Sequence, residues 1–68
     1  MPMGKPPTQR EVMQGLRDHL GPNKEAVCRA YVAAEARGLI VRKSITKTAE
    51  QYADYLWRDG IHKGWLKP

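Results

Sequence analysis

The 68-residue sequence contains one cysteine, no phenylalanine and only five aromatic residues. A single cysteine excludes an intramolecular disulfide, and a chain this short buries only roughly 60% of the surface that its unfolded form exposes. The core must therefore be assembled from Leu, Val, Ile, Met, Tyr and Trp supplied by every segment. We expect low stability, a reducing cytoplasmic location and a homodimer that enlarges the small core.

Long hydrophobic runs are also missing. The first ten residues, MPMGKPPTQR, carry charge but no apolar segment of the kind found in secretion signals, and no apolar run approaches the roughly 20 residues of a membrane span. We therefore expect a protein that is neither secreted nor membrane-spanning. Residues 1–7 contain three prolines, a glycine and a lysine, which predicts a flexible basic arm before a single domain over residues 8–68.

The periodicity of apolar residues predicts an all-α fold, a compact domain of three helices. The first helix is expected over residues 9–20. Thr8 and Glu11 have the spacing of a capping box, in which each side chain accepts a hydrogen bond from an otherwise unpaired backbone N–H. The pair Gly21-Pro22 supplies a residue that tolerates a left-handed turn and one that cannot extend the helix.

The second helix is predicted over residues 24–37 and the third over residues 48–59. Asn23 is a favourable N-cap for the second helix, and Gly38 and Gly60 are expected to end the two helices. In the common glycine-terminated motif, the residue after the glycine folds back on the helix. By this rule Leu39 contacts Ala34 and Ile61 contacts Leu56, while Trp65 and Leu66 place the tail on the helices.

Between the second and third helices lies the only strongly basic part of the chain. Residues 36–49 contain four cations and no acid around the apolar run Leu39-Ile40-Val41. This pattern predicts a short extended basic connector that contacts phosphates together with the start of the third helix. The alternative is a solvated loop. The residues expected to contact nucleic acid are Arg29, Arg37, Arg42, Lys43, Ser44, Lys47 and Lys63.

A helix-turn-helix arrangement is one way to present such residues to duplex DNA. If Gly21 were its turn, the second helix would be the recognition helix and would expose Arg29. Arg17, however, stands four residues before that glycine, where a small side chain is expected. If Gly38 were the turn, Ala34 would fit the small position, but no helix begins directly afterwards. The order of helices and turns therefore resembles a helix-turn-helix, but neither glycine has all the features that the turn of this motif requires.

Tyr55 and Trp57 on the third helix suggest a second class of function. Exposed aromatic side chains are enriched at binding surfaces, so these two residues are candidates for a partner interface. In this alternative the protein is a small interaction module or inhibitor, and its basic segment steers it towards an acidic protein partner. Ordinary packing against the core is the other interpretation of Trp57.

Catalytic and metal-binding patterns are absent from the sequence. His19, Cys28 and His62 are too far apart for metal-ligand spacing, and no phosphate loop or paired-carboxylate signature occurs. We therefore expect no enzyme, no metal and no cofactor. The sequence favours a small cytoplasmic nucleic-acid-binding protein, most simply one that binds duplex DNA in transcription regulation or as an accessory factor.

Overall fold

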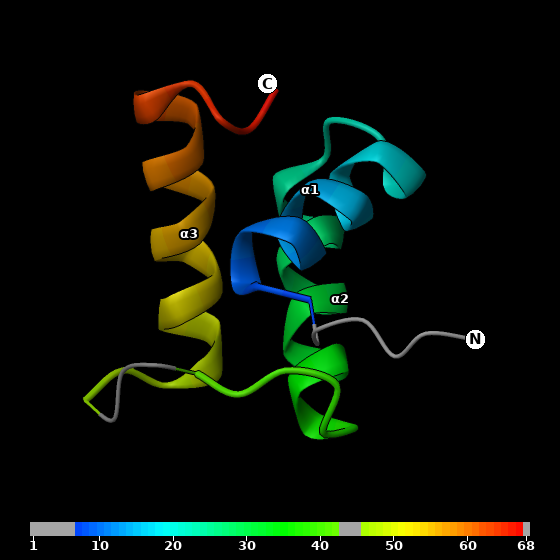
Figure 1. Cartoon of the computed structure of the whole chain (residues 1–68), viewed down its shortest axis with the longest axis vertical. Helices are drawn as coiled ribbons and strands as arrows, with labels where there is room; N and C mark the ends of the chain where they lie inside the picture. The colour runs from blue at the N-terminus through cyan, green and yellow to red at the C-terminus, as the bar shows by residue number, and fades with distance from the viewer. Residues whose placement is uncertain (1–6, 43–45, 68) are drawn as a thin grey trace.

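The computed structural model of the chain describes residues 7–42 and 46–67, which form three helices (Figure 1). The helices are α1 (Gln9–Leu20), α2 (Lys24–Ala36) and α3 (Ala49–Lys63). No strand occurs in the described parts of the chain. The predicted all-α, three-helix fold is therefore confirmed.

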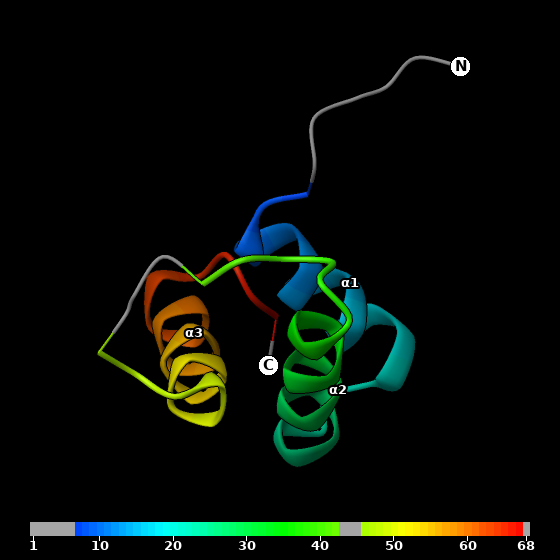
Figure 2. The ribbon, with the colours of Figure 1, turned by 90° about the horizontal axis from the view of Figure 1, so that it is seen from below.

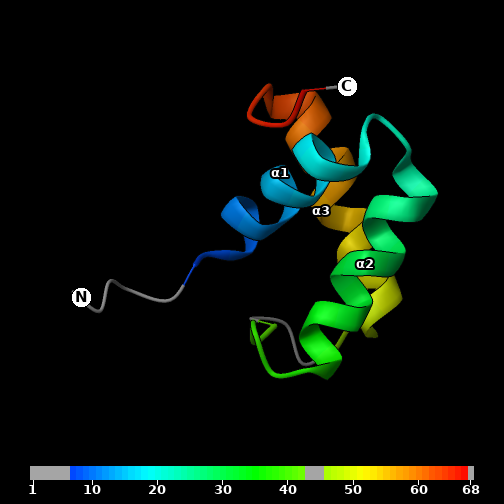
Figure 3. The ribbon, with the colours of Figure 1, turned by 90° about the vertical axis from the view of Figure 1, so that its right-hand side faces the viewer.

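The helices form two layers. α2 and α3 lie side by side and run in opposite directions, while α1 crosses one face of this pair (Figures 1 and 2). The connector, which we define as residues 37–48, joins the end of α2 to the start of α3, and its residues 37–42 run along the face that α1 covers (Figure 2). No described helix covers the opposite face of the pair, as the side view also shows (Figure 3).

All three helices begin at side-chain caps. Thr8 forms the expected capping box: its hydroxyl accepts from the N–H of Glu11 at 3.1 Å, and its own N–H donates to that carboxylate at 2.8 Å. The Asn23 side chain accepts from Ala26 N at 3.1 Å. Thr48 starts α3 with a second capping box, which it shares with Gln51. The starts of α1 and α2 are the predicted ones, and α3 starts one residue after the predicted residue 48.

The end of α3 differs from the prediction. The helix continues through Gly60 to Lys63 and ends at Gly64, whose φ of 86° lies in the left-handed region. The predicted end at residue 59 is therefore wrong by four residues. Gly60 is buried in the helix because the tail packs on it: a Cβ at this position would lie 2.5 Å from the Cβ of Leu66.

The residues that fold back after the helix ends also differ. At the end of α2, Leu39 N donates to Ala34 O at 3.1 Å, yet the Leu39 side chain is 58% exposed and Ile40 enters the core. Ile61 lies within α3 and is exposed, so its predicted position after the helix is wrong. Leu66 takes the equivalent place, because its N–H donates to Gly60 O at 3.1 Å and its side chain is buried.

The core lies between the two layers and draws on every helix, the connector and the tail. Its buried members are Met13, Val27, Tyr31, Ile40, Tyr52, Ala53, Leu56 and Leu66. The expected placement of the tail on the helices is confirmed. Trp65 is half-buried, and its indole N–H donates to Asp59 at 3.2 Å, while the Arg10 guanidinium lies 5.0 Å above its ring.

Across the described residues, every helix is too short or too polar to cross a membrane.

Candidate nucleic-acid interface

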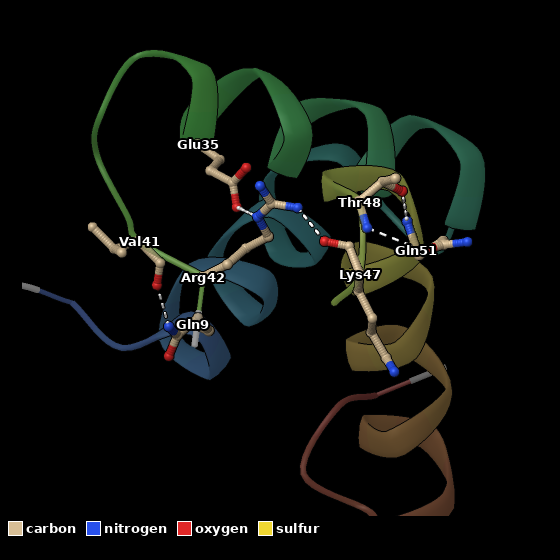
Figure 4. A network of polar contacts seen from close by, with 7 residues as sticks. All are labelled: Gln9, Glu35, Val41, Arg42, Lys47, Thr48 and Gln51. Carbon is tan, nitrogen blue, oxygen red and sulfur yellow. Dashed lines mark hydrogen bonds and ion pairs between the residues drawn. The ribbon is translucent and has the colours of Figure 1, made fainter. Parts of the chain in front are cut away.

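Arg42 has an internal role in the connector (Figure 4). Its Nε lies 2.9 Å from Oε2 of Glu35, near the end of α2, and its Nη1 donates to the backbone carbonyl of Lys47, just before α3. The Arg42 side chain is only 32% exposed and that of Glu35 only 15%. The guanidinium therefore ties the two ends of the connector together, which limits its availability to an external phosphate.

The connector is also fixed to α1. The side-chain amide of Gln9 donates to the backbone carbonyl of Val41 at 2.6 Å (Figure 4). The Val41 side chain itself is 79% exposed, and Leu39 is exposed beside it in the sequence. The described part of the connector is thus held by its backbone and by Arg42, while two apolar side chains face solvent.

Two predicted contact residues lie at the connector end of the molecule with their charges uncompensated. Arg37 follows the last residue of α2 and is exposed, and Lys47 precedes the Thr48 cap of α3. Within the described residues neither forms an ion pair with an acid. Because α2 and α3 are antiparallel, the two cations lie at the same end of the bundle. The acid closest in sequence to Arg37, Glu35, is already paired with Arg42.

The other predicted contact residues do not join this group. Arg29 lines a groove between α2 and α3 whose floor includes Cys28 and Val32. Lys63 stands near the opposite end of α3 and pairs with Asp59 at 3.3 Å. Lys43 and Ser44 lie outside the described residues. Of the predicted set, the structure therefore brings together Arg37, Arg42 and Lys47.

A hollow on the outer side of α3 was not predicted. It measures about 420 Å³, and we call it the α3 hollow; it is lined by Thr46, Lys47, Gln51, Asp54, Tyr55 and Arg58. The Lys47 ammonium lies 5.6 Å from the centroid of the Tyr55 ring. The signal in the sequence was the four-residue spacing of Gln51 and Tyr55, which places these two side chains on one face of a helix. Lys47 precedes that helix and is brought to the ring by the connector.

The single acid of the α3 hollow is neutralised by cations. Asp54 accepts from Lys24 Nζ at 2.5 Å and from Arg58 Nη2 at 2.8 Å, one cation at each carboxylate oxygen. The hydrogen bond from Lys24 is the main cause that lowers the pKa of Asp54, so the carboxylate stays ionised and paired at neutral pH. With Lys47 added, the surroundings of the hollow carry a net positive charge.

Tyr55 is the exposed end of a series of aromatic rings. Its ring stacks on that of Tyr52, with centroids 5.8 Å apart and planes 29° apart, and Tyr52 lies 6.4 Å from Tyr31 in the core. Tyr55 is 41% exposed. Trp57, the other residue of the predicted partner interface, lies roughly 200° further around the helix and packs against the core. The two aromatics therefore face different sides of α3.

The remaining candidate groups show no further site. Burial is the main cause that raises the pKa of the Cys28 thiol, which disfavours the reactive thiolate. In the described parts of the chain, no three His, Cys, Asp or Glu side chains come together in a cluster that could hold a metal ion. Comparisons of the chain with models of protein families, with curated proteins and with solved structures give no match.

Proposed function

We propose that the protein binds nucleic acid, with duplex DNA as the first target, through the connector end of the bundle. The observation that carries the proposal is the pair of uncompensated cations, Arg37 and Lys47, near the two ends of the connector. Cations placed in this way neutralise phosphates and release their counterions. In a cytoplasmic regulator or accessory factor, this end would provide affinity for the phosphate backbone rather than for particular bases.

The capping box of α3 limits which groups are available for the proposed contact. The hydroxyl of Thr48 accepts from Gln51 N at 3.1 Å, and Gln51 Oε1 accepts from Thr48 N at 3.0 Å. Two backbone donors at the start of α3 are thus already used within the capping box. The proposal therefore rests on side-chain cations and leaves Arg42 as the residue that positions the connector.

The test is binding of labelled duplex DNA across a salt series. We expect affinity to fall as salt rises, and the variant Arg37→Glu/Lys47→Glu to lose binding at moderate salt. Each lost phosphate contact removes about 0.9 from the log–log slope, so a reduction of about 2 is expected for the double variant. Arg42→Glu is a poor probe, because it would place a second carboxylate beside Glu35 and disturb the connector itself.

The matched control is Arg29→Glu/Lys67→Glu, which lowers the net charge by the same amount at exposed positions away from the connector end. This control should weaken binding much less and leave the slope close to that of the wild type. Equal losses in both double variants would indicate attraction by net charge alone and would overturn the proposed site. Absence of binding by the wild type at low salt would overturn the function.

A further inference from the structure

We propose that the α3 hollow receives one unpaired base of a bound nucleic acid strand, which stacks on Tyr55. This inference rests on the proposed function and adds the form of nucleic acid that the protein prefers. It predicts tighter binding to DNA that contains a single-stranded segment than to an intact duplex. The hollow, at about 420 Å³, falls in the range of small-ligand sites.

The aromatic ring is supported from beneath. Tyr55 stacks on Tyr52, which is buried, and Tyr52 in turn lies against the fully buried Tyr31. A ring held in this way loses little conformational freedom when a base stacks on it. Stacking on an exposed aromatic side chain is the common way in which proteins hold unpaired bases, and it tolerates any base because every base has a π-face.

The polar groups around the ring suit the rest of a nucleotide. The Lys47 ammonium lies over the ring, 5.6 Å from its centroid, and Arg58 borders the hollow with its side chain 70% exposed. A base that stacks on Tyr55 takes the place of the ammonium over the ring, and the long Lys47 and Arg58 side chains then contact the phosphates that flank this base. Gln51 uses its Oε1 in the capping box, which leaves its NH₂ group as a donor towards a base edge or sugar.

Lys47 links the hollow to the connector end. It is one of the two uncompensated cations of the proposed interface, and it also lies over the Tyr55 ring. A strand whose phosphates contact Arg37 and Lys47 would therefore reach the α3 hollow with its next nucleotides. Within a duplex the bases are stacked on each other and paired, so a base can enter the hollow only where the strand is unpaired.

The experiment compares three DNA ligands at one salt concentration: an intact duplex, the same duplex with a short single-stranded gap, and the gapped strand alone. The wild type should prefer both ligands with unpaired bases over the intact duplex by about ten-fold, the range that one stacked base supplies. Tyr55→Leu should abolish this preference, since it removes the ring but keeps an apolar contact with Tyr52. Tyr55→Phe should retain the preference.

A crosslinking readout locates the base directly. The gap is synthesised with 5-iodouracil, which reacts on irradiation with an aromatic ring stacked against it, and the adduct is mapped by mass spectrometry. The expected adduct is on Tyr55, with none from the same base placed inside the intact duplex. An adduct confined to Trp57 or Trp65 would overturn the inference.

The outcomes separate this inference from the function on which it rests. Equal affinity of the wild type for intact and gapped duplex would overturn the base site and leave duplex binding standing. If Tyr55→Leu still prefers the gapped duplex over the intact duplex, and thermal unfolding shows that its fold is intact, the base site is likewise overturned and duplex binding stands. A free mononucleotide that binds as tightly as the gapped duplex would also overturn it, because the site would then recognise a nucleotide rather than a strand.

Discussion

Gly60 is a buried helical residue on which the C-terminal tail rests. A Cβ at this position would lie 2.5 Å from the Cβ of Leu66 and 3.1 Å from two atoms of the Trp65 ring. The Gly60 carbonyl accepts from the N–H groups of both Gly64 and Leu66, at 2.8 and 3.1 Å. Small size rather than backbone freedom is what this position requires, because Gly60 has ordinary helical geometry.

Gly60→Ala should therefore lower the free energy of unfolding by about 1–3 kcal/mol, the usual cost of overpacking, despite the higher helix propensity of alanine. Gly15→Ala is the matched control, since Gly15 lies in α1 and a Cβ there meets no atom within 4 Å. That variant should raise the free energy of unfolding by about 0.5–1 kcal/mol. Urea unfolding measures both, and a stabilised Gly60→Ala protein would contradict this account of the tail.

Tyr31 is the buried ionisable residue at the centre of the core. Its side chain is fully buried, and its hydroxyl has no hydrogen-bond partner among the described protein groups. Desolvation is the main cause that raises the pKa of Tyr31 above its ordinary value. Because the folded pKa exceeds the unfolded one, the stabilising contribution is complete below about pH 10 and is lost as pH rises towards the folded pKa.

We expect the wild type to lose stability as the pH rises from about 10 to about 12, and Tyr31→Phe to lose less over the same interval. The measurement is the difference between the two proteins in urea midpoint at each pH. Parallel pH profiles for the wild type and Tyr31→Phe would show that Tyr31 does not titrate with unfolding.

At the scale of elements, the ion pair of Arg42 with Glu35 holds the described part of the connector to α2. Arg42 reaches Glu35 on α2 and the carbonyl of Lys47 before α3. Arg42→Ala should lower the free energy of unfolding by about 1–3 kcal/mol, because the largely buried Glu35 carboxylate loses its partner. Arg37→Ala, which removes an exposed arginine that has no acidic partner among the described residues, should change it by less than about 0.5 kcal/mol.

A double-mutant cycle separates the ion pair from the loss of packing. Arg42→Met/Glu35→Met replaces both charges by apolar groups and should recover most of the stability that Arg42→Ala loses. The cycle is completed by the single variants Arg42→Met and Glu35→Met. A loss of stability in the double variant that equals or exceeds the sum of the two single losses would show that the pair does not act as a unit.

Much of each element could be predicted from the sequence, because caps are local. Thr8, Asn23 and Gly38 stand within three residues of the groups that they contact, so spacing alone reveals them. The end of α3 was missed because Gly60 has the sequence signature of a helix stop. Its actual reason, the approach of Leu66, depends on how the tail folds.

Less of the candidate site could be predicted from the sequence, because the site depends on contacts between segments that are far apart in the chain. A sum of charges along the chain counts Arg42 and Lys47 alike. In the structure, however, Arg42 forms an ion pair with Glu35, whereas Lys47 lies over the Tyr55 ring. Which cation finds an acid depends on the packing of α2, α3 and the connector. The α3 hollow depends in addition on a cation, Lys47, placed by the connector beside a tyrosine of α3.

On the scale of the whole molecule, the C-terminal tail joins α1 to α3. Arg17 of α1 donates from Nε to the carbonyl of Lys67 at 2.9 Å, and Trp65 lies between Arg10 of α1 and Asp59 of α3. Leu66 fills the space between these contacts and is only 2% exposed. The tail is thus part of the core, and we expect its loss to destabilise all three helices.

Leu66→Ala should lower the free energy of unfolding by about 2–4 kcal/mol, a large part of the roughly 5 kcal/mol typical of a domain this small. Leu39→Ala makes the same chemical change at a 58% exposed position and should cost less than about 0.5 kcal/mol.

Tryptophan fluorescence reports on the tail and α3, while circular dichroism reports on all helices. Because Leu66 belongs to the single core, the two signals should shift together to lower urea concentration. A fluorescence transition that moves while the helical signal does not would mean that the tail unfolds alone, and that the three helices hold together without it.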